Sequence, residues 1–332
     1  EGGEVAVIRL KVPEGETVVE DEIMGTVKFN NIEVDDQVLV KSDGFPTYHL
    51  AVVVDDHLMK ITHMLRGQEW LSSTPKQILL YKMLGWDAPK FAHVPLLLNA
   101  DGTKLSKRQG DVAVGDYLRR GYLPEALINF VATLGFNPTG DREIYTVEEL
   151  IEMFDLSKVK RSGAVMNMEK LDWMNNQYIK QLSIEELAKH AEDFVQADAS
   201  NETVQRALFV ERERVNRLDE LQEKITSYIT EPAYDPSIII WRKADAADAR
   251  VQLEGVLALL RDADDTVFGS VENLEKEVKD YIAENELSNG NVLWPLRVSL
   301  SGMERSAGPF EYLWVLGKDQ GIARIEKALT LI

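Results

Sequence analysis

The hydrophobic pattern of the chain changes about one third of the way along its 332 residues. Up to about residue 100, short runs rich in β-branched residues alternate with turn signals, which predicts strands. From about residue 112 onward, apolar residues recur every three or four positions, which predicts helices. A chain with this pattern is expected to fold as a mixed α/β section followed by an all-helical section, and its length suits more than one domain.

The expected elements can be assigned to residue ranges. Strands are expected at 5–12, 23–29, 38–40 and 47–54, followed by a helix at 74–84 with Thr74 as its N-cap and Pro75 at its first helical position. Ser or Thr followed three residues later by Glu marks two further helix starts, at Thr146 and Ser183. Helices are expected at 124–135, 146–154, 167–177, 183–195, 204–229, 244–260, 271–286, 309–316 and 320–331.

Composition excludes several classes of protein and site. The chain has no Cys, so it forms no disulfides and offers no thiolate for zinc, and no zinc is expected. Charged residues interrupt the apolar runs well before the 18 or so residues that a membrane helix requires, so no membrane partner is expected. The four residues Asp55, Asp56, His57 and His63 lack a further spaced ligand, and we expect no metal there.

The chain is strongly acidic, with 37 Lys and Arg against 56 Asp and Glu and a formal net charge of −19. That average argues against a nucleic-acid partner, because phosphate contacts rely on Lys and Arg. The basic residues, however, gather in short stretches: Lys104, Lys107, Arg108, Arg119 and Arg120; Lys158, Lys160 and Arg161; and Arg206, Arg212, Arg214 and Arg217. An acidic chain with such basic islands remains compatible with a structured RNA partner.

The strongest short motif is a turn at Gly102 followed by Lys104 and Lys107, with the hydroxyl of Ser106 between the two lysines. Lysines on a flexible loop can close over phosphate oxygens as mobile charges, so this loop suits a polyphosphate. A solvated basic loop without a function gives the same pattern. The spacing alone leaves both interpretations open.

Taken with its neighbours, the motif resembles that of the bacterial-type glutamyl-tRNA synthetases, which are class I aminoacyl-tRNA synthetases. Lys104-Leu105-Ser106-Lys107-Arg108 is similar to the signature usually written KMSKS. Further segments follow the order of the family: DGFPTYHLAVVVDDH at 43–57, LRGQEW at 65–70, STP at 73–75, GYLPEAL at 121–127, LGF at 134–136 and KLDWMN at 170–175. Several motifs in the same order are more specific than any one of them, and the resemblance is firmest over residues 41–179.

The resemblance implies a multidomain fold. We expect the second half of a Rossmann-like class I catalytic domain with a β-containing insertion remnant, followed by all-α stem-contact and helical-cage anticodon-binding domains. The implied divisions are 1–43 for the remnant of the acceptor-stem-binding insertion, 44–103 for the catalytic half, 104–181 for the KLSKR loop and the stem-contact domain, and 182–236 and 237–332 for two anticodon-binding subdomains. The family's first ATP signature, written HIGH, does not occur in the chain. We therefore expect a C-terminal fragment that does not activate glutamate alone.

Site residues follow from the resemblance, position by position. Tyr48 and Arg66 are expected to bind L-glutamate, and a guanidinium group suits a carboxylate. Val52 stands where some family members place an Asn toward the substrate. The resemblance assigns ATP binding to Lys104, Leu105, Lys107, Glu69 and Trp70, and catalysis to Lys104, Lys107 and Arg108, with Lys107 as the main stabiliser of charge at the α-phosphate. Mg²⁺ is expected to be held mainly by ATP phosphates and water.

By resemblance, Arg214 is expected to bind the third anticodon base of tRNA(Glu), because the planar arginine fork can bond to base edges. The arginines around it could equally form a salt-bridged face of one helix. The implied function is ATP-dependent formation of glutamyl-adenylate and transfer of glutamate to the 3′ end of tRNA(Glu), in a monomeric cytoplasmic enzyme of bacterial or organellar type. Two alternatives stay open: an enzyme like glutaminyl-tRNA synthetase, against which the helical section argues, and a tRNA-binding module without catalysis.

Overall fold

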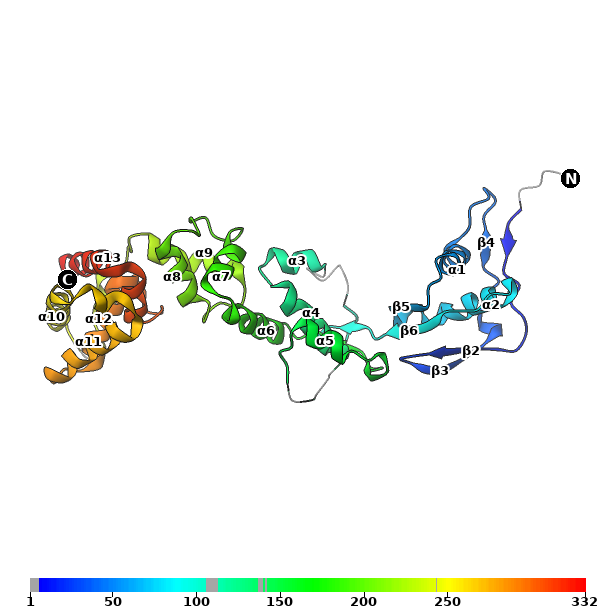
Figure 1. The fold of residues 1–332 in the computed structure, drawn as a ribbon, viewed down its shortest axis with the longest axis horizontal. Helices are drawn as coiled ribbons and strands as arrows, with labels where there is room; N and C mark the ends of the chain where they lie inside the picture. The colour runs from blue at the N-terminus through cyan, green and yellow to red at the C-terminus, as the bar shows by residue number, and fades with distance from the viewer. Residues whose placement is uncertain (1–5, 106–112, 137–139, 141, 243) are drawn as a thin grey trace. The chain divides into compact units, whose positions relative to one another are not determined.

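The computed structural model describes residues 6–105, 113–136, 140, 142–242 and 244–332, and Figure 1 shows the course of the chain. Two compact units are present, and each is built from two separate segments. The first unit contains Glu1–Ala113 and Leu127–Leu171, and the second contains Val114–Ala126 and Asp172–Ile332. Within the described ranges, no helix is long and apolar enough to cross a bilayer.

The largest sheet of the first unit has four strands in the order β3-β2-β6-β5. Strands β2 (Glu16–Asp21) and β3 (Gly25–Asn30) make an antiparallel hairpin, whereas β6 (Lys90–Val94) runs parallel to both β2 and β5 (His63–Gly67). Two smaller sheets pair β1 (Ile8–Arg9) with β4 (Val38–Val40), and β7 (Leu97–Leu98) with β8 (Ala164–Val165). The strand at 38–40 is confirmed, the strand expected at 23–29 begins two residues later, and β2 was not predicted.

The run at 47–54, which was expected to be a strand, is part of helix α1 (Tyr48–Leu58), so that prediction is wrong. Thr47 is extended and begins the helix directly after Pro46. The spacing of the buried residues His49 and Val53 is helical, and α1 packs on α2 (Thr74–Leu84), where Leu80 and Tyr81 join Val53 in a small core. This packing outweighs the modest cost of β-branched residues in a helix.

Helix α2 is confirmed at 74–84, but its N-cap is Ser73 rather than Thr74. The Thr74 hydroxyl instead donates a hydrogen bond to the carbonyl of Trp70 and lies 3.1 Å from His93 Nε2. The other ring nitrogen of His93 lies 2.6 Å from Asp21 Oδ2, and both side chains are fully buried. Although burial opposes its charge, hydrogen bonds from Met24 N and from His93 hold the pKa of Asp21 below its usual value.

Replacing Asp21 by Asn is expected to lower the free energy of unfolding of the first unit by about 2 kcal/mol at pH 7, because a charged acceptor of several hydrogen bonds is lost. Since the pKa of Asp21 is lower in the folded state, its contribution is complete above about pH 4 and is lost as the pH falls through the folded value. Urea unfolding at a series of pH values measures this difference. The exposed Asp87→Asn is the control, and a difference that persists unchanged in acid would contradict the prediction.

The second unit consists of helices around one continuous core that includes Leu208, Leu253, Leu296 and Leu313. Its complete helices are α3 (Val114–Arg119), α7 (Ile184–Ala191), α8 (Glu202–Glu211), α9 (Leu221–Ile229), α10 (Ala246–Asp262), α11 (Val271–Glu284), α12 (Asn289–Ser301) and α13 (Pro309–Leu331). Helices α4 (Pro124–Gly135) and α6 (Met168–Gln181) belong in part to each unit, and α5 (Val147–Met153) belongs to the first. Both predicted capping boxes, at Thr146 and Ser183, are confirmed.

Two predictions for the helical section need correction. The single helix expected at 204–229 is interrupted by a turn at 212–217, where side chains replace helical hydrogen bonds: Asn176 donates to the carbonyls of Arg212 and Val215, and Asn175 donates to that of Asn216. Helix α12 was missed because it contains Pro295. The helices expected at 309–316 and 320–331 are present and run together as α13, with a kink at Gly317, whose φ is 70°.

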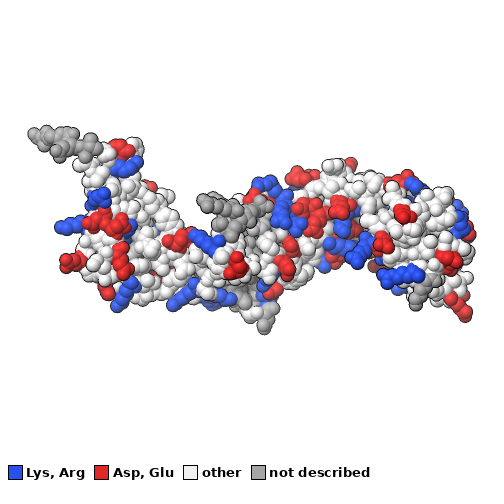
Figure 2. Space-filling model, turned by 180° about the vertical axis from the view of Figure 1, so that it is seen from behind, with Lys and Arg blue, Asp and Glu red and all other residues white. Residues whose placement is uncertain are grey.

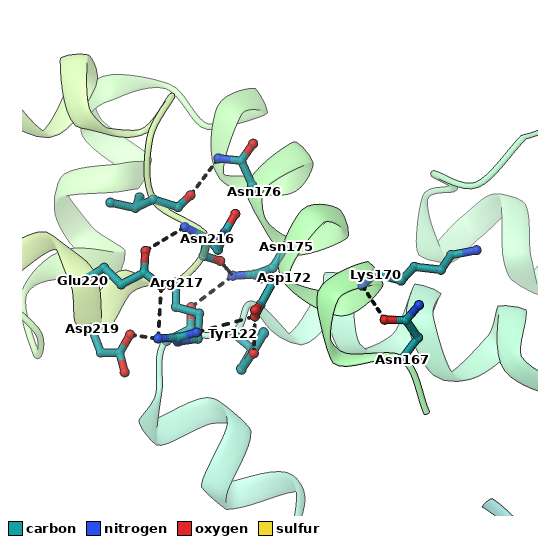
Figure 3. A network of polar contacts seen from close by, with 12 residues as sticks. Tyr122, Asn167, Lys170, Asp172, Asn175, Asn176, Asn216, Arg217, Asp219 and Glu220 are labelled. Atoms are coloured by element: carbon teal, nitrogen blue, oxygen red, sulfur yellow. Dashed lines mark hydrogen bonds and ion pairs between the residues drawn. The ribbon is translucent and has the colours of Figure 1, made fainter. Parts of the chain in front are cut away.

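A polar network holds this turn against the residues that precede α4 (Figure 3). Arg217 contacts the carboxylates of Asp172, Asp219 and Glu220, and the Tyr122 hydroxyl donates to Asp172. Close by, Gly121 has a φ of +81°, and a β-carbon built there would lie 2.5 Å from the backbone nitrogen of Leu218. Only glycine therefore fits at this crossing of two chain segments.

Candidate functional site

One helix and one strand bring the predicted glutamate-binding residues together in the first unit. Tyr48, Val52 and Asp56 recur every four residues on α1, while Arg66 lies on β5. The Tyr48 ring is 5.1 Å from the Trp70 ring, and the Arg66 guanidinium lies 5.8 Å from the centre of the same Trp70 ring. Tyr48, from the motif at 43–57, thus forms one cluster with Arg66 and Trp70, from the motif at 65–70.

Buried polar atoms that have no hydrogen-bond partner among the described residues gather around Arg66. Its Nε and Nη1 atoms are among them, as are the Tyr81 hydroxyl and Asp56 Oδ2. Burial lowers the pKa of Arg66, against the opposing effects of Tyr48 and Asp56, and burial raises the pKa of Asp56. Burial also raises the pKa of Tyr81 to about 12. A partly buried guanidinium with two unused donors is suited to bind a carboxylate from outside the chain.

Residues predicted to bind ATP lie along the neighbouring segments. Glu69 and Trp70 belong to the 3-10 helix Gln68–Ser73, which follows β5 directly. Lys104 Nζ lies 3.4 Å from Glu69 Oε1, and both side chains are about half exposed. The backbone nitrogen of Leu105 donates to the carbonyl of Leu97 and so anchors the start of the loop. Lys107 and Arg108 fall outside the described residues.

Arg214 lies in the turn after α8, at the edge of a cavity of about 240 Å³ in the second unit. Its Nη2 donates to both carboxylate oxygens of Glu311, at 2.8 and 2.7 Å, and its Nη1 donates to the carbonyl of Val210. Although burial opposes this shift, Glu311 raises the pKa of Arg214. Ser306 and Tyr312 also line the cavity.

The four arginines of this region do not share one helix face, so that interpretation is wrong. Arg206 lies on α8, Arg212 caps it, Arg214 lies in the turn and Arg217 precedes the 3-10 helix Leu218–Glu220. Several of them are paired with acids, as Arg206 is with Glu202. On the face in Figure 2, Lys and Arg are interspersed with Asp and Glu.

The sequence reading missed three polar residues of the Arg66 cluster, namely Asp56, Gln77 and Tyr81. Gln77 and Tyr81 are four residues apart on α2 and are both buried. Helical spacing from Tyr48 to Asp56 was the available signal, and the assignment of a strand there concealed it. Nothing in the sequence pattern indicated that Glu311 pairs with Arg214.

Known protein families match both the first section of the chain and the helical section. Residues 1–173 match the family model "tRNA synthetases class I (E and Q), catalytic domain", and residues 186–329 match the model "Anticodon binding domain". Curated relatives include the glutamate-tRNA ligases of Prosthecochloris aestuarii, 42% identical over 98% of this chain and 67% of the relative, and of Chloroherpeton thalassium, 43% identical over 99% and 68%. The chain thus spans about two thirds of the length of these relatives.

A solved glutamate-tRNA ligase from Elizabethkingia meningosepticum, in complex with its amino acid, is similar with a TM-score of 0.85 and 34% identity over 98% of this chain and 68% of that one. Fold and matches together define a class I tRNA synthetase catalytic region followed by a helical anticodon-binding domain. Within that class, the chain belongs to the glutamate-tRNA ligase family. The expected fold class is confirmed.

Proposed function

We propose that the protein ligates L-glutamate to tRNA(Glu) at the expense of ATP, and that Tyr48 and Arg66 bind the amino acid. The observation that carries the proposal is a pair of buried Arg66 nitrogens, beside Tyr48 and Trp70, that have no partner in the part of the chain that the structure describes. The test is glutamate-dependent exchange of pyrophosphate into ATP by the native protein at full length. Exchange that depends on glutamine instead would support the glutaminyl alternative, which the names of the relatives do not favour.

In the first step, a carboxylate oxygen of glutamate attacks the α-phosphorus of ATP and pyrophosphate leaves. In the second, a ribose hydroxyl of the tRNA attacks the carbonyl carbon and AMP leaves. Because no protein nucleophile is needed, catalysis consists of positioning and of stabilising phosphate charge. We assign the charge stabilisation to Lys104, Lys107 and Arg108, and contacts with the nucleotide to Leu105, Glu69 and Trp70. Mg²⁺ would enter with ATP, held by phosphate oxygens and water.

The pairing of Lys104 with Glu69 fits this role. An exposed ion pair at 3.4 Å contributes little to stability, so incoming phosphate oxygens can replace Glu69 as the partner of Lys104 at small cost. Glu69 would then keep Lys104 close to the nucleotide site before ATP arrives.

Chemistry also decides which carboxylate Arg66 holds. The α-carboxylate must attack phosphorus and become an acyl group, so a cation bound to it would reduce its nucleophilicity. The side-chain carboxylate is unchanged in both steps and is the group that distinguishes glutamate from glutamine. We therefore assign Arg66 to the side-chain carboxylate.

Replacing Arg214 by Ala is expected to abolish the preference for the native third anticodon base, which we expect to be about ten- to hundredfold in affinity. The measurement is the dissociation constant for tRNA(Glu) and for the same tRNA with that base replaced, at one fixed salt concentration. Arg250→Ala, an exposed arginine on α10, is the control. A preference that survives in Arg214→Ala would show that another residue recognises the base.

The remaining assignments complete the proposal. The relatives named above are bacterial proteins, and we propose a monomeric enzyme of the bacterial cytoplasm. We retain the divisions 1–43, 44–103, 104–181, 182–236 and 237–332 as its functional regions.

A further inference from the structure

Gln77 is a fully buried polar residue on α2, and its side-chain carbonyl oxygen accepts a hydrogen bond from Arg66 Nη2. Arginine has donors but no acceptor, so the atom that faces Arg66 must be the oxygen of the amide. This fixes the orientation of Gln77. Its NH2 group, Nε2, is buried and has no hydrogen-bond partner among the described residues.

The unpartnered donors at this place outnumber the unpartnered acceptors. Arg66 contributes Nε and Nη1, Gln77 contributes Nε2, and Asp56 Oδ2 is an acceptor whose charge burial disfavours. Buried donors in native proteins nearly always have a partner, so the group that completes this pocket must be rich in acceptors. A carboxylate offers two oxygens with about four acceptor positions and no donor, whereas water brings two donors of its own.

We propose that Gln77 is a substrate-binding residue of the glutamate pocket: its Oε1 orients Arg66, and its Nε2 donates a hydrogen bond to the side-chain carboxylate that Arg66 binds. This inference rests on the proposed function and deepens it. Arg66 supplies the charge, and Gln77 fixes the direction of the guanidinium while adding a second, neutral donor. Glutamine as a substrate would present its own NH2 group to these donors, so Gln77 also contributes to the preference for glutamate.

The first test uses Gln77→Met in the native protein at full length, because Met has a similar volume and removes both amide atoms. The KM for glutamate is expected to rise about ten- to hundredfold, as for loss of a hydrogen bond to a charged group, while kcat changes much less. The same change at the exposed Gln181 is the matched control. A KM for glutamate that stays within about twofold of the native value would overturn the inference.

A second test separates direct contact from positioning alone. The side-chain ¹⁵NH2 signal of Gln77, identified by its absence from Gln77→Met or Gln77→Glu, is expected to shift when L-glutamate is added. It should not shift with L-2-aminobutyrate, which lacks the side-chain carboxylate. If glutamate binds and the signal does not move, Gln77 only positions Arg66 and the inference is wrong. If Arg66→Ala binds glutamate as tightly as the native protein, the proposed pocket itself fails.

Discussion

Replacing Arg66 by Ala is expected to reduce kcat/KM for glutamate in pyrophosphate exchange by about 10²- to 10³-fold. Arg66 holds two buried nitrogens that have no partner among the described residues. Removing one partner of a buried charged pair typically costs 2–5 kcal/mol, because the other charge is left unpaired. In this protein the substrate carboxylate would be left beside Asp56, whose charge would then oppose it. The measurement is the initial rate of exchange over a range of glutamate concentrations, with ATP saturating.

Two further variants make this result specific. Arg66→Lys is expected to recover only part of the loss, because lysine lacks the planar set of donors that contacts Gln77 and a carboxylate together. Arg9→Ala, at an exposed position of the first unit, should behave as the native protein. Circular dichroism of each variant shows whether it is folded. Exchange by a folded Arg66→Ala at nearly the native rate would place the glutamate site elsewhere.

Replacing Arg324 by Met is expected to lower the free energy of unfolding of the helical unit by about 3 kcal/mol, because buried carbonyls lose a charged donor. Arg324 lies on α13, is only 8% exposed, and donates to four backbone carbonyls. These belong to Ser227, Tyr228, Thr230 and Leu300, at distances from 2.5 to 2.9 Å. They stand at the ends of α9 and α12, where helical carbonyls lack partners within the helix. One guanidinium thus provides hydrogen-bond donors for the carbonyls at two helix ends. With Met at this position, these carbonyls would be buried without a donor.

Urea denaturation of the native protein and the Arg324 variant measures this loss, with Arg250→Met as an exposed control on α10. Arg324→Lys should retain part of the stability, because an ammonium group can reach some of the four carbonyls but not all of them. A loss below about 1 kcal/mol in Arg324→Met would show that water or rearranged side chains satisfy these carbonyls equally well.

Local sequence signals predicted the helical section best. The helix at 124–135 and the two capping boxes depend on residues within one or two turns of each other, and all are present. Local signals predicted α1 wrongly as a strand. Its β-branched run is helical because it is stabilised by packing on α2 rather than by local preference. The break at 212–217 was equally invisible, since it is produced by Asn175 and Asn176, which are distant in sequence.

In the candidate site, too, residues within motifs could be predicted, whereas contacts between distant residues could not. Tyr48, Arg66 and Trp70 could be predicted because their motifs resemble those of a known family, and the structure brings them together. Their assignment to glutamate and ATP stays a prediction until the variants are measured. The partner of Arg214 could not be predicted, because Glu311 lies on another helix far along the chain and carries no motif of its own.

The close approach of Gly121 to Leu218 has a consequence for synthesis of the protein on the ribosome. The segment Val114–Ala126 belongs to the second unit, yet Leu127–Leu171, which belongs to the first, is translated before the rest of the second unit. At a synthesis rate of roughly 5–20 residues per second, Leu218 is added to the chain about 5–20 s after Gly121. During that interval the nascent chain exposes Tyr122 and Leu123, which are buried in the finished fold. A chaperone that covers Tyr122 and Leu123 during this interval would shield two side chains that the finished fold buries.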